Sequence, residues 1–125
     1  MDDRHKSAIV AALAQPYFAM ITNFEPHPMG CLVHVWILPT TGPSSIEGFK
    51  QGMLTIKCSL PADDHKANKL ILSLVRRCFE VRPLLISGKT SRYKLIVLSS
   101  LSPHGARTKL AHHLNHRKEA SPDPH

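Results

Sequence analysis

The sequence predicts an α+β fold whose elements follow one another in the order β-β-α-β-β-α. Residues 53–60 alternate between apolar and polar side chains, which is typical of a strand with one buried face. Residues 63–78 repeat their apolar side chains at helical spacing, which indicates an amphipathic helix. Two apolar runs, 84–87 and 93–98, flank a basic turn at 88–92 and predict a pair of strands.

The composition indicates one compact domain, because 125 residues with 42% hydrophobic side chains are ordinary for a globular protein. No run approaches the roughly 20 consecutive apolar residues of a membrane helix. The cysteines, Cys31, Cys58 and Cys78, form no C-x-x-C pair, which argues against a disulfide framework or a zinc site. We therefore expect a cytoplasmic monomer that uses neither a cofactor nor a metal and does not bind a membrane.

The formal net charge of +7 is concentrated in the part of the chain that is predicted to fold. Residues 31–100 contain ten Lys and Arg against four Asp and Glu, so they carry +6 of this charge. A positive surface of this kind favours RNA or another polyanion as a partner, and it says nothing about the fold.

The two ends of the chain are predicted to lie outside the domain. Residues 1–30 are read as an N-terminal extension or linker, because proline and glycine interrupt any period. Residues 8–14 outline a weak signal peptide, but the acidic residues at positions 2 and 3 oppose it, so a short helix or a disordered extension is favoured. Residues 116–125 are predicted to be a disordered tail, which leaves 31–115 as the domain.

The domain is predicted to begin with a strand at residues 31–38. A segment rich in glycine and proline, 39–52, is predicted to be a long loop before the strand at 53–60. One of the aspartates at positions 63 and 64 is predicted to cap the central helix, and a second helix is predicted at 103–115.

A simple topology brings the start of the central helix and the basic turn to one edge of the domain. If strand 53–60 runs upward, the helix descends and strand 84–87 rises again, so the turn at 88–92 lies beside the start of the helix. The loop 39–52 lies at the opposite edge if strand 31–38 pairs antiparallel with strand 53–60. The residues that converge beside the helix start form the candidate binding site: Lys66, Asn68, Lys69, Gly88, Lys89, Thr90, Ser91, Arg92 and Lys94.

Two segments at this edge resemble the YggU-like family, small proteins of unknown function. LPADDHKANKLILSLV (60–75) is similar to the family pattern A-P-P-x-D-G-K-A-N-x-x-L, and SGKTSRYK (87–94) is similar to S-G-x-x-S-R-x-K. Pro39 and Gly48 add to the resemblance, which covers roughly residues 31–99. The matching positions in the two segments are Pro61, Asp64, Lys66, Ala67, Asn68, Leu70, Ser87, Gly88, Ser91, Arg92 and Lys94.

The resemblance implies a two-layer α+β domain in which a mixed four-stranded sheet carries two helices on one face. It implies no established activity. The chain departs from the family pattern at Ala62 and His65, where the family has proline and glycine. A role that needs a bare backbone at the start of the helix is therefore not implied for this chain.

The tripeptide at 88–90, Gly-Lys-Thr, looks like the end of a phosphate-binding P-loop. That motif is excluded, because Pro83 stands where its first glycine belongs and a strand follows in place of a helix. The turn can still bind an anion through its backbone N–H groups and the Arg92 guanidinium. The favoured alternative is a structural latch, in which Arg92 pairs with an aspartate at the helix start and Asn68 hydrogen-bonds the turn backbone.

Two further patterns carry weaker signals. On the outward sheet face, Trp36 lies beside His34 and Lys57, which suits the stacking of a base, although cover by residues 1–20 is favoured. The helical spacing of the histidines in HHLNH (112–116) suits a metal, but the motif lacks the glutamate of H-E-x-x-H, so a solvated segment is favoured.

Nothing in the sequence singles out a catalytic nucleophile, so we expect a binding module rather than an enzyme. The predicted function is weak binding of nucleic acid, RNA above all, through the candidate site, with Arg76 and Arg77 extending the basic track. Two alternatives stay open: an enzyme that holds a small anionic substrate at the same edge through Arg92, and a protein-interaction domain that uses an uncovered Trp36.

Overall fold

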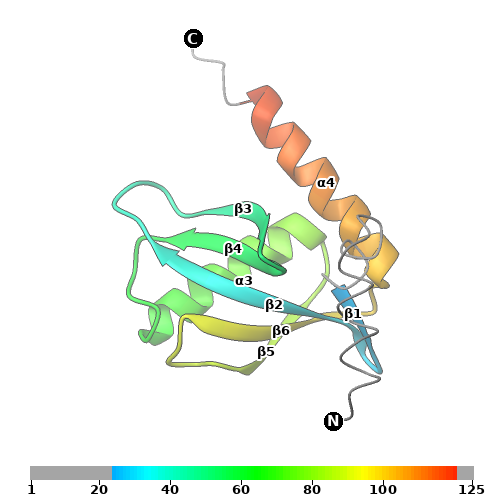
Figure 1. The fold of residues 1–125 in the computed structure, drawn as a ribbon, viewed down its shortest axis with the longest axis horizontal. Coiled ribbons are helices and arrows are strands. Elements are labelled where there is room, and N and C mark those ends of the chain that lie inside the picture. Colours follow the sequence, from blue (N-terminus) through cyan, green and yellow to red (C-terminus); the bar gives the residue numbers. More distant parts are fainter. Residues whose placement is uncertain (1–23, 121–125) are drawn as a thin grey trace.

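The computed structural model of the protein describes residues 24–120, with side chains as far as His116. Across these residues the chain forms six strands and two helices: β1 (Phe24–His27), β2 (Gly30–Pro39), β3 (Ser45–Lys50), β4 (Met53–Cys58), α3 (His65–Phe79), β5 (Pro83–Ser87), β6 (Tyr93–Ser99) and α4 (Pro103–Ala120). The strands form one mixed sheet in the order β3-β4-β2-β6-β5, and β1 pairs with β2. The α+β class is confirmed, but the sheet has six strands in this part of the chain rather than four (Figure 1).

Strand β3 forms within the segment that was predicted to be a loop. The β3–β4 connection is Gln51-Gly52, and both residues have positive φ angles (55° and 80°), as a tight hairpin turn requires. Gly48 lies at a register shift in β3 with a φ of 109°. Glycines in a bulge and a turn, rather than in a loop, account for the wrong prediction.

Strand β3 also determines the direction of β2. Because β3 returns the chain between them, β2 and β4 run parallel, so the antiparallel pairing on which the opposite placement of segment 39–52 depended does not occur. The end of β2 consequently lies at the same edge as the end of β4 and the start of α3. Strand β5 is antiparallel to β6, which is antiparallel to β2, so β5 runs in the direction of β4, as predicted.

Both ends of the described chain are more regular than the sequence suggested. Strand β1 lies within residues 1–30, which were read as linker, and it tolerates Pro26 because it pairs with β2 alone. Helix α4 continues to Ala120, into the predicted tail, because residues 117–120 are good helix formers and the first proline comes only at position 122. The predictions about a signal peptide and about cover of Trp36 by residues 1–20 concern residues outside the described part of the chain.

Helix α3 begins and ends at defined caps. The carboxylate of Asp64 accepts a hydrogen bond from the backbone N–H of Lys66 at 2.9 Å, as an N-cap does. At the other end Glu80 adopts a left-handed conformation (φ 59°), and its N–H donates to the carbonyl of Arg76 at 2.8 Å. The helix thus ends at Phe79, before Pro83.

The core lies between one face of the sheet and the two helices. Figure 1 shows α3 behind the sheet and α4 running from β1 past β3. The predicted apolar stripe of α3 joins the inward side chains of the strands in one core, and α4 adds Ala106 and Leu110. Phe24 of β1 is fully buried and packs edge to face on Phe49 and Phe79, with ring centroids 5.1 and 5.7 Å apart. Strand β1 is therefore part of the core.

Replacing Phe24 with alanine tests this assignment. The substitution leaves a cavity beside Phe79 and removes two aromatic contacts, so we expect a loss of about 3–5 kcal/mol of unfolding free energy in chemical denaturation. Met29→Ala is the control, because Met29 is exposed and its loss should change stability by less than about 0.5 kcal/mol. If the two variants were equally stable, β1 would not be part of the core, and the interpretation of these residues as a linker would be right.

Candidate functional site

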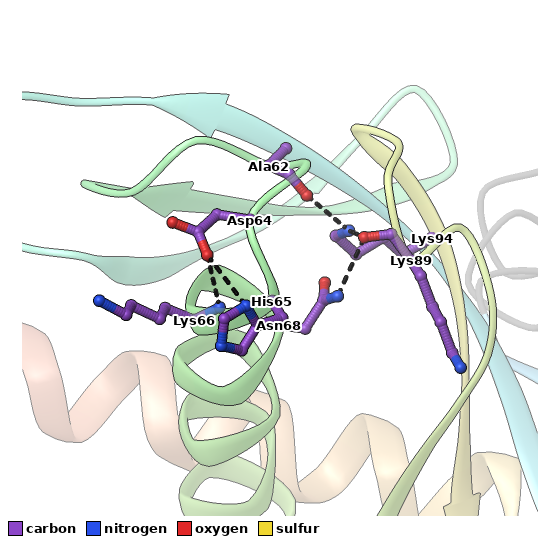
Figure 2. A network of polar contacts seen from close by, with 7 residues as sticks. All are labelled: Ala62, Asp64, His65, Lys66, Asn68, Lys89 and Lys94. Carbon is purple, nitrogen blue, oxygen red and sulfur yellow. Dashed lines mark hydrogen bonds and ion pairs between the residues drawn. The ribbon is translucent and has the colours of Figure 1, made fainter.

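The structure confirms that the start of α3 and the turn after β5 are neighbours. The Nδ2 of Asn68, on the first turns of α3, donates a hydrogen bond to the carbonyl oxygen of Lys89 at 2.9 Å (Figure 2). Figure 2 shows the Asn68 amide between the helix and the turn. The Asn68 part of the predicted latch is therefore confirmed.

Lys94 is a second and stronger part of the latch, and it is not a surface residue. Its side chain is fully buried, and its ammonium donates to the carbonyl oxygens of Ala62 (3.0 Å), Gly88 (2.7 Å) and Lys89 (3.4 Å). These three carbonyls belong to the loop before α3 and to the turn, whereas Lys94 itself lies on β6. The prediction that Lys94 belongs to an accessible binding surface is wrong, because its charge is satisfied inside the protein.

Burial and local charge act in opposite directions on this ammonium. Removal from water lowers the pKa of Lys94 below its usual value of 10.5, because burial disfavours the charged form, while the neighbouring Cys58 and Asp63 act to raise it. Three carbonyl acceptors match the three N–H donors of an ammonium, which explains how a lysine is accommodated in the interior.

Two other predicted site residues shape the turn. Gly88 has a φ of 89°, and a Cβ at this position would collide with the carbonyl oxygen of Tyr93, so only glycine fits. The Ser91 N–H donates to the Gly88 carbonyl at 3.1 Å, and the Ser91 hydroxyl accepts from the Tyr93 N–H at 2.9 Å. Both residues therefore hold the backbone of the turn.

The remaining predicted residues are exposed: Lys66, Lys69, Lys89, Thr90 and Arg92. Within the described chain Arg92 forms no ion pair with Asp63 or Asp64, so this part of the predicted latch is wrong. Figure 2 shows that the side chains of Lys66 and Lys89 point away from each other, on opposite sides of Asn68. The expected single basic cluster is thus divided between α3 and the turn.

The larger group of cations lies along α3. Lys66, Lys69, Arg76 and Arg77 are all exposed and lie within an arc of about 100°, opposite the buried stripe, over a length of about 16 Å. None of the four forms an ion pair with a described carboxylate. We call these four residues the α3 basic stripe.

A cavity also lies at the edge of the sheet where α3 begins. It has a volume of about 540 Å³ and lies where the ends of β2 and β4 meet the loop before α3 and the turn. Arg92, Thr90, Asp63 and the buried Cys58 contribute to its lining. A half-open cavity of this size suits a small molecule, and the guanidinium suits an anionic group on it.

Sequence reasoning missed a polar cluster on the open face of the sheet. Glu25, His34 and Tyr93 come from three different strands and are joined by hydrogen bonds. The alternation of β2 placed His34 on the outward face, but only the pairing of β1 and β6 with β2 reveals its partners. Trp36, on the same face, is 36% exposed.

Other features of the described chain limit the chemistry. All three cysteines are buried, and burial raises the pKa of Cys31 to about 11 and that of Cys78 to about 12, so neither thiol ionises readily. Within residues 24–116 no three His, Cys, Asp or Glu side chains gather as metal ligands. None of the described helices has the length and apolar character to cross a membrane. No model of a known protein family matches the chain.

Replacing Lys94 with methionine tests whether the buried ammonium holds the edge together. Methionine fills a similar space but strands the three carbonyl oxygens, so we expect a loss of about 1–3 kcal/mol of unfolding free energy. Lys89→Met is the matched control on an exposed side chain and should change stability by less than about 0.5 kcal/mol.

The pH dependence of stability, compared between the wild type and Lys94→Met, is a second test. The pKa of Lys94 in the folded protein lies below the unfolded value of 10.5, so between these two pKa values the unfolded chain binds more protons than the folded one. The free energy of unfolding of the wild type should therefore rise with pH over that interval, relative to that of Lys94→Met. Parallel stability curves for wild type and Lys94→Met would contradict a lowered pKa.

Proposed function

We propose that this protein binds nucleic acid, with RNA as the preferred partner, through the α3 basic stripe. The observation that supports this most is the row of four exposed cations on one helix face, none of them paired with a described carboxylate. Unpaired Lys and Arg side chains are available to displace counterions from phosphates, which drives sequence-independent binding.

The local charge explains why Lys69, Arg76 and Arg77, rather than Lys66 at the helix start, are expected to supply most of the proposed contact. Asp63 and Asp64 stand before α3, and Asp64 already occupies the free N–H of Lys66. These carboxylates repel phosphate at the first turn. Lys69, Arg76 and Arg77 lie farther along the helix, where the described residues place no acid beside them before Glu80, whose carboxylate pairs with Lys109.

Membership of the YggU-like family is part of the same proposal. It is supported by the contact between the two segments that carry the resemblance, since Asn68 donates to the carbonyl of Lys89 and Lys94 donates to that of Ala62. Motif residues that meet in space and hold one another have a shared structural reason to occur together.

The salt dependence of RNA binding tests the proposal. With four phosphates neutralised, the log–log slope against salt should be about −3, so the affinity for a labelled single-stranded RNA should fall about fiftyfold between about 50 and 200 mM salt. Fluorescence anisotropy measures it. The triple variant Lys69→Gln, Arg76→Gln, Arg77→Gln should bind at least about tenfold more weakly, with a slope near −1.

A charge-matched control is available on other elements. Lys50→Gln, Lys57→Gln and Arg107→Gln together remove the same net charge from β3, β4 and α4. This control should retain most of the affinity. Equal weakening by both triple variants would mean that only net charge matters, and it would contradict the assignment to α3.

The cavity at Arg92 favours a second candidate function, the binding of a small molecule with a carboxylate or phosphate group. Arg92 and Thr90 supply a cation and a hydroxyl to its lining, opposite the end of β2. The carboxylate of Asp63 in the same lining disfavours a ligand with several negative charges, and it can accept a hydrogen bond from a donor group of the ligand.

Titration with inorganic phosphate separates the two candidates. If the cavity binds anions, the backbone amide resonances of Thr90 and Arg92 should shift in NMR spectra, and Arg92→Ala should abolish the shift while RNA binding stays within about twofold. Arg82→Ala is the control, because Arg82 is an exposed arginine that precedes β5. Unmoved Thr90 and Arg92 resonances would remove the second candidate.

A further inference from the structure

The open face of the sheet carries a chain of three side chains that neither proposed function uses. Glu25 lies on β1, His34 on the central strand β2 and Tyr93 on β6. In the register of the sheet Tyr93 is opposite Trp36 and diagonal to His34, so the side chains share one face. The rings of His34 and Tyr93 are nearly parallel, with an angle of 17° between their planes.

The hydrogen bonds indicate which ring nitrogen of His34 carries the hydrogen. The Nε2 of His34 lies 2.8 Å from Oε2 of Glu25, and an ionised carboxylate only accepts, so Nε2 carries the hydrogen. In the neutral imidazole Nδ1 is then an acceptor, and the Tyr93 hydroxyl, at 2.6 Å, donates to it. A hydroxyl, a histidine base and a carboxylate that orients the base are therefore connected in series.

This connection is the one that activates nucleophiles in acyl-transfer enzymes. The base must lie within hydrogen-bond reach of the hydroxyl, and a third group must fix its tautomer, and both conditions are met here. We propose that Glu25, His34 and Tyr93 form a nucleophilic triad in which the Tyr93 hydroxyl accepts an acyl group from aryl esters.

The surroundings of Tyr93 indicate the substrate class. A cavity of about 660 Å³, open to solvent, borders the triad and is also lined by Trp36, Gly52 and Met53. Trp36 and Tyr93 are 36% and 40% exposed, so a flat ring has an indole to pack on, and the hydroxyl is accessible beside it. An ester of a phenol places its ring on Trp36 and its carbonyl near Tyr93.

The step balances without a cofactor. The Tyr93 oxygen attacks the ester carbonyl carbon while its proton passes to Nδ1 of His34, and Glu25 stabilises the imidazolium. The tetrahedral intermediate breaks the bond to the phenol oxygen, which takes the proton from His34, and Tyr93 is left O-acylated. Water then attacks this ester with His34 as base, which releases the carboxylic acid and restores the tyrosine.

Treatment of the full-length chain with 4-nitrophenyl acetate tests the triad. We expect Tyr93 to be acetylated about 100-fold faster than Tyr17, the other tyrosine of the chain, as measured by peptide mass spectrometry on quenched samples. His34→Gln should remove this advantage, and Glu25→Gln, which no longer fixes the tautomer, should reduce it about tenfold or more.

A network that only ties strands together predicts a different result. In that case Tyr93 is acetylated no faster than Tyr17, or its rate is the same in wild type and His34→Gln, and either outcome overturns the proposal. His34→Gln removes both hydrogen bonds of this part-exposed network, whereas Glu25→Gln alters only the one at Nε2. Thermal melting identifies a variant that has not folded, and the other variant still decides. RNA binding should be unchanged in both, because the α3 basic stripe lies on the opposite side of the sheet.

Discussion

The architecture of the candidate edge depends on one buried cation. The ammonium of Lys94 is taken out of water and bound by carbonyls from the loop before α3 and from the turn after β5. An unsatisfied buried charge costs far more than a stranded amide, so these backbone groups are fixed in position around it. Gly88, whose carbonyl accepts from the ammonium, must be glycine, since its φ is 89° and a Cβ there would collide with the carbonyl oxygen of Tyr93.

The bonds around Lys94 give a structural explanation for the two segments, 60–75 and 87–94, that carry the family resemblance. Of the polar residues in the candidate site, Asn68, Ser91 and Lys94 hydrogen-bond the backbone of the edge, which gives their spacing a structural reason. The groups that remain free for a partner are the exposed cations. Two segments that combine small, polar and basic residues therefore contain both positions that hold the backbone and exposed cations, and only burial and hydrogen bonding distinguish the two.

The sequence predicted the structure well where apolar side chains repeat with a single period. It predicted α3 and its buried stripe, the outer and inner faces of β2, and the meeting of helix and turn, because amphipathic periods and chain direction are local properties. It missed β1 and β3, where proline and glycine serve edge pairing, a bulge and a hairpin turn. It also missed the burial of Lys94, since no local pattern distinguishes a lysine that meets three distant carbonyls from one in water.

The same limit explains why the triad was invisible in the sequence. Glu25, His34 and Tyr93 are brought together by two strand pairings, one of them with a strand that was read as linker. With the helices covering one face of the sheet, the other face is left for side chains that do not belong to the core. The α3 basic stripe and the triad are consequently on opposite sides of one sheet, so changes to one surface leave the hydrogen bonds of the other intact. The proposed RNA contact and the proposed triad therefore share no residue.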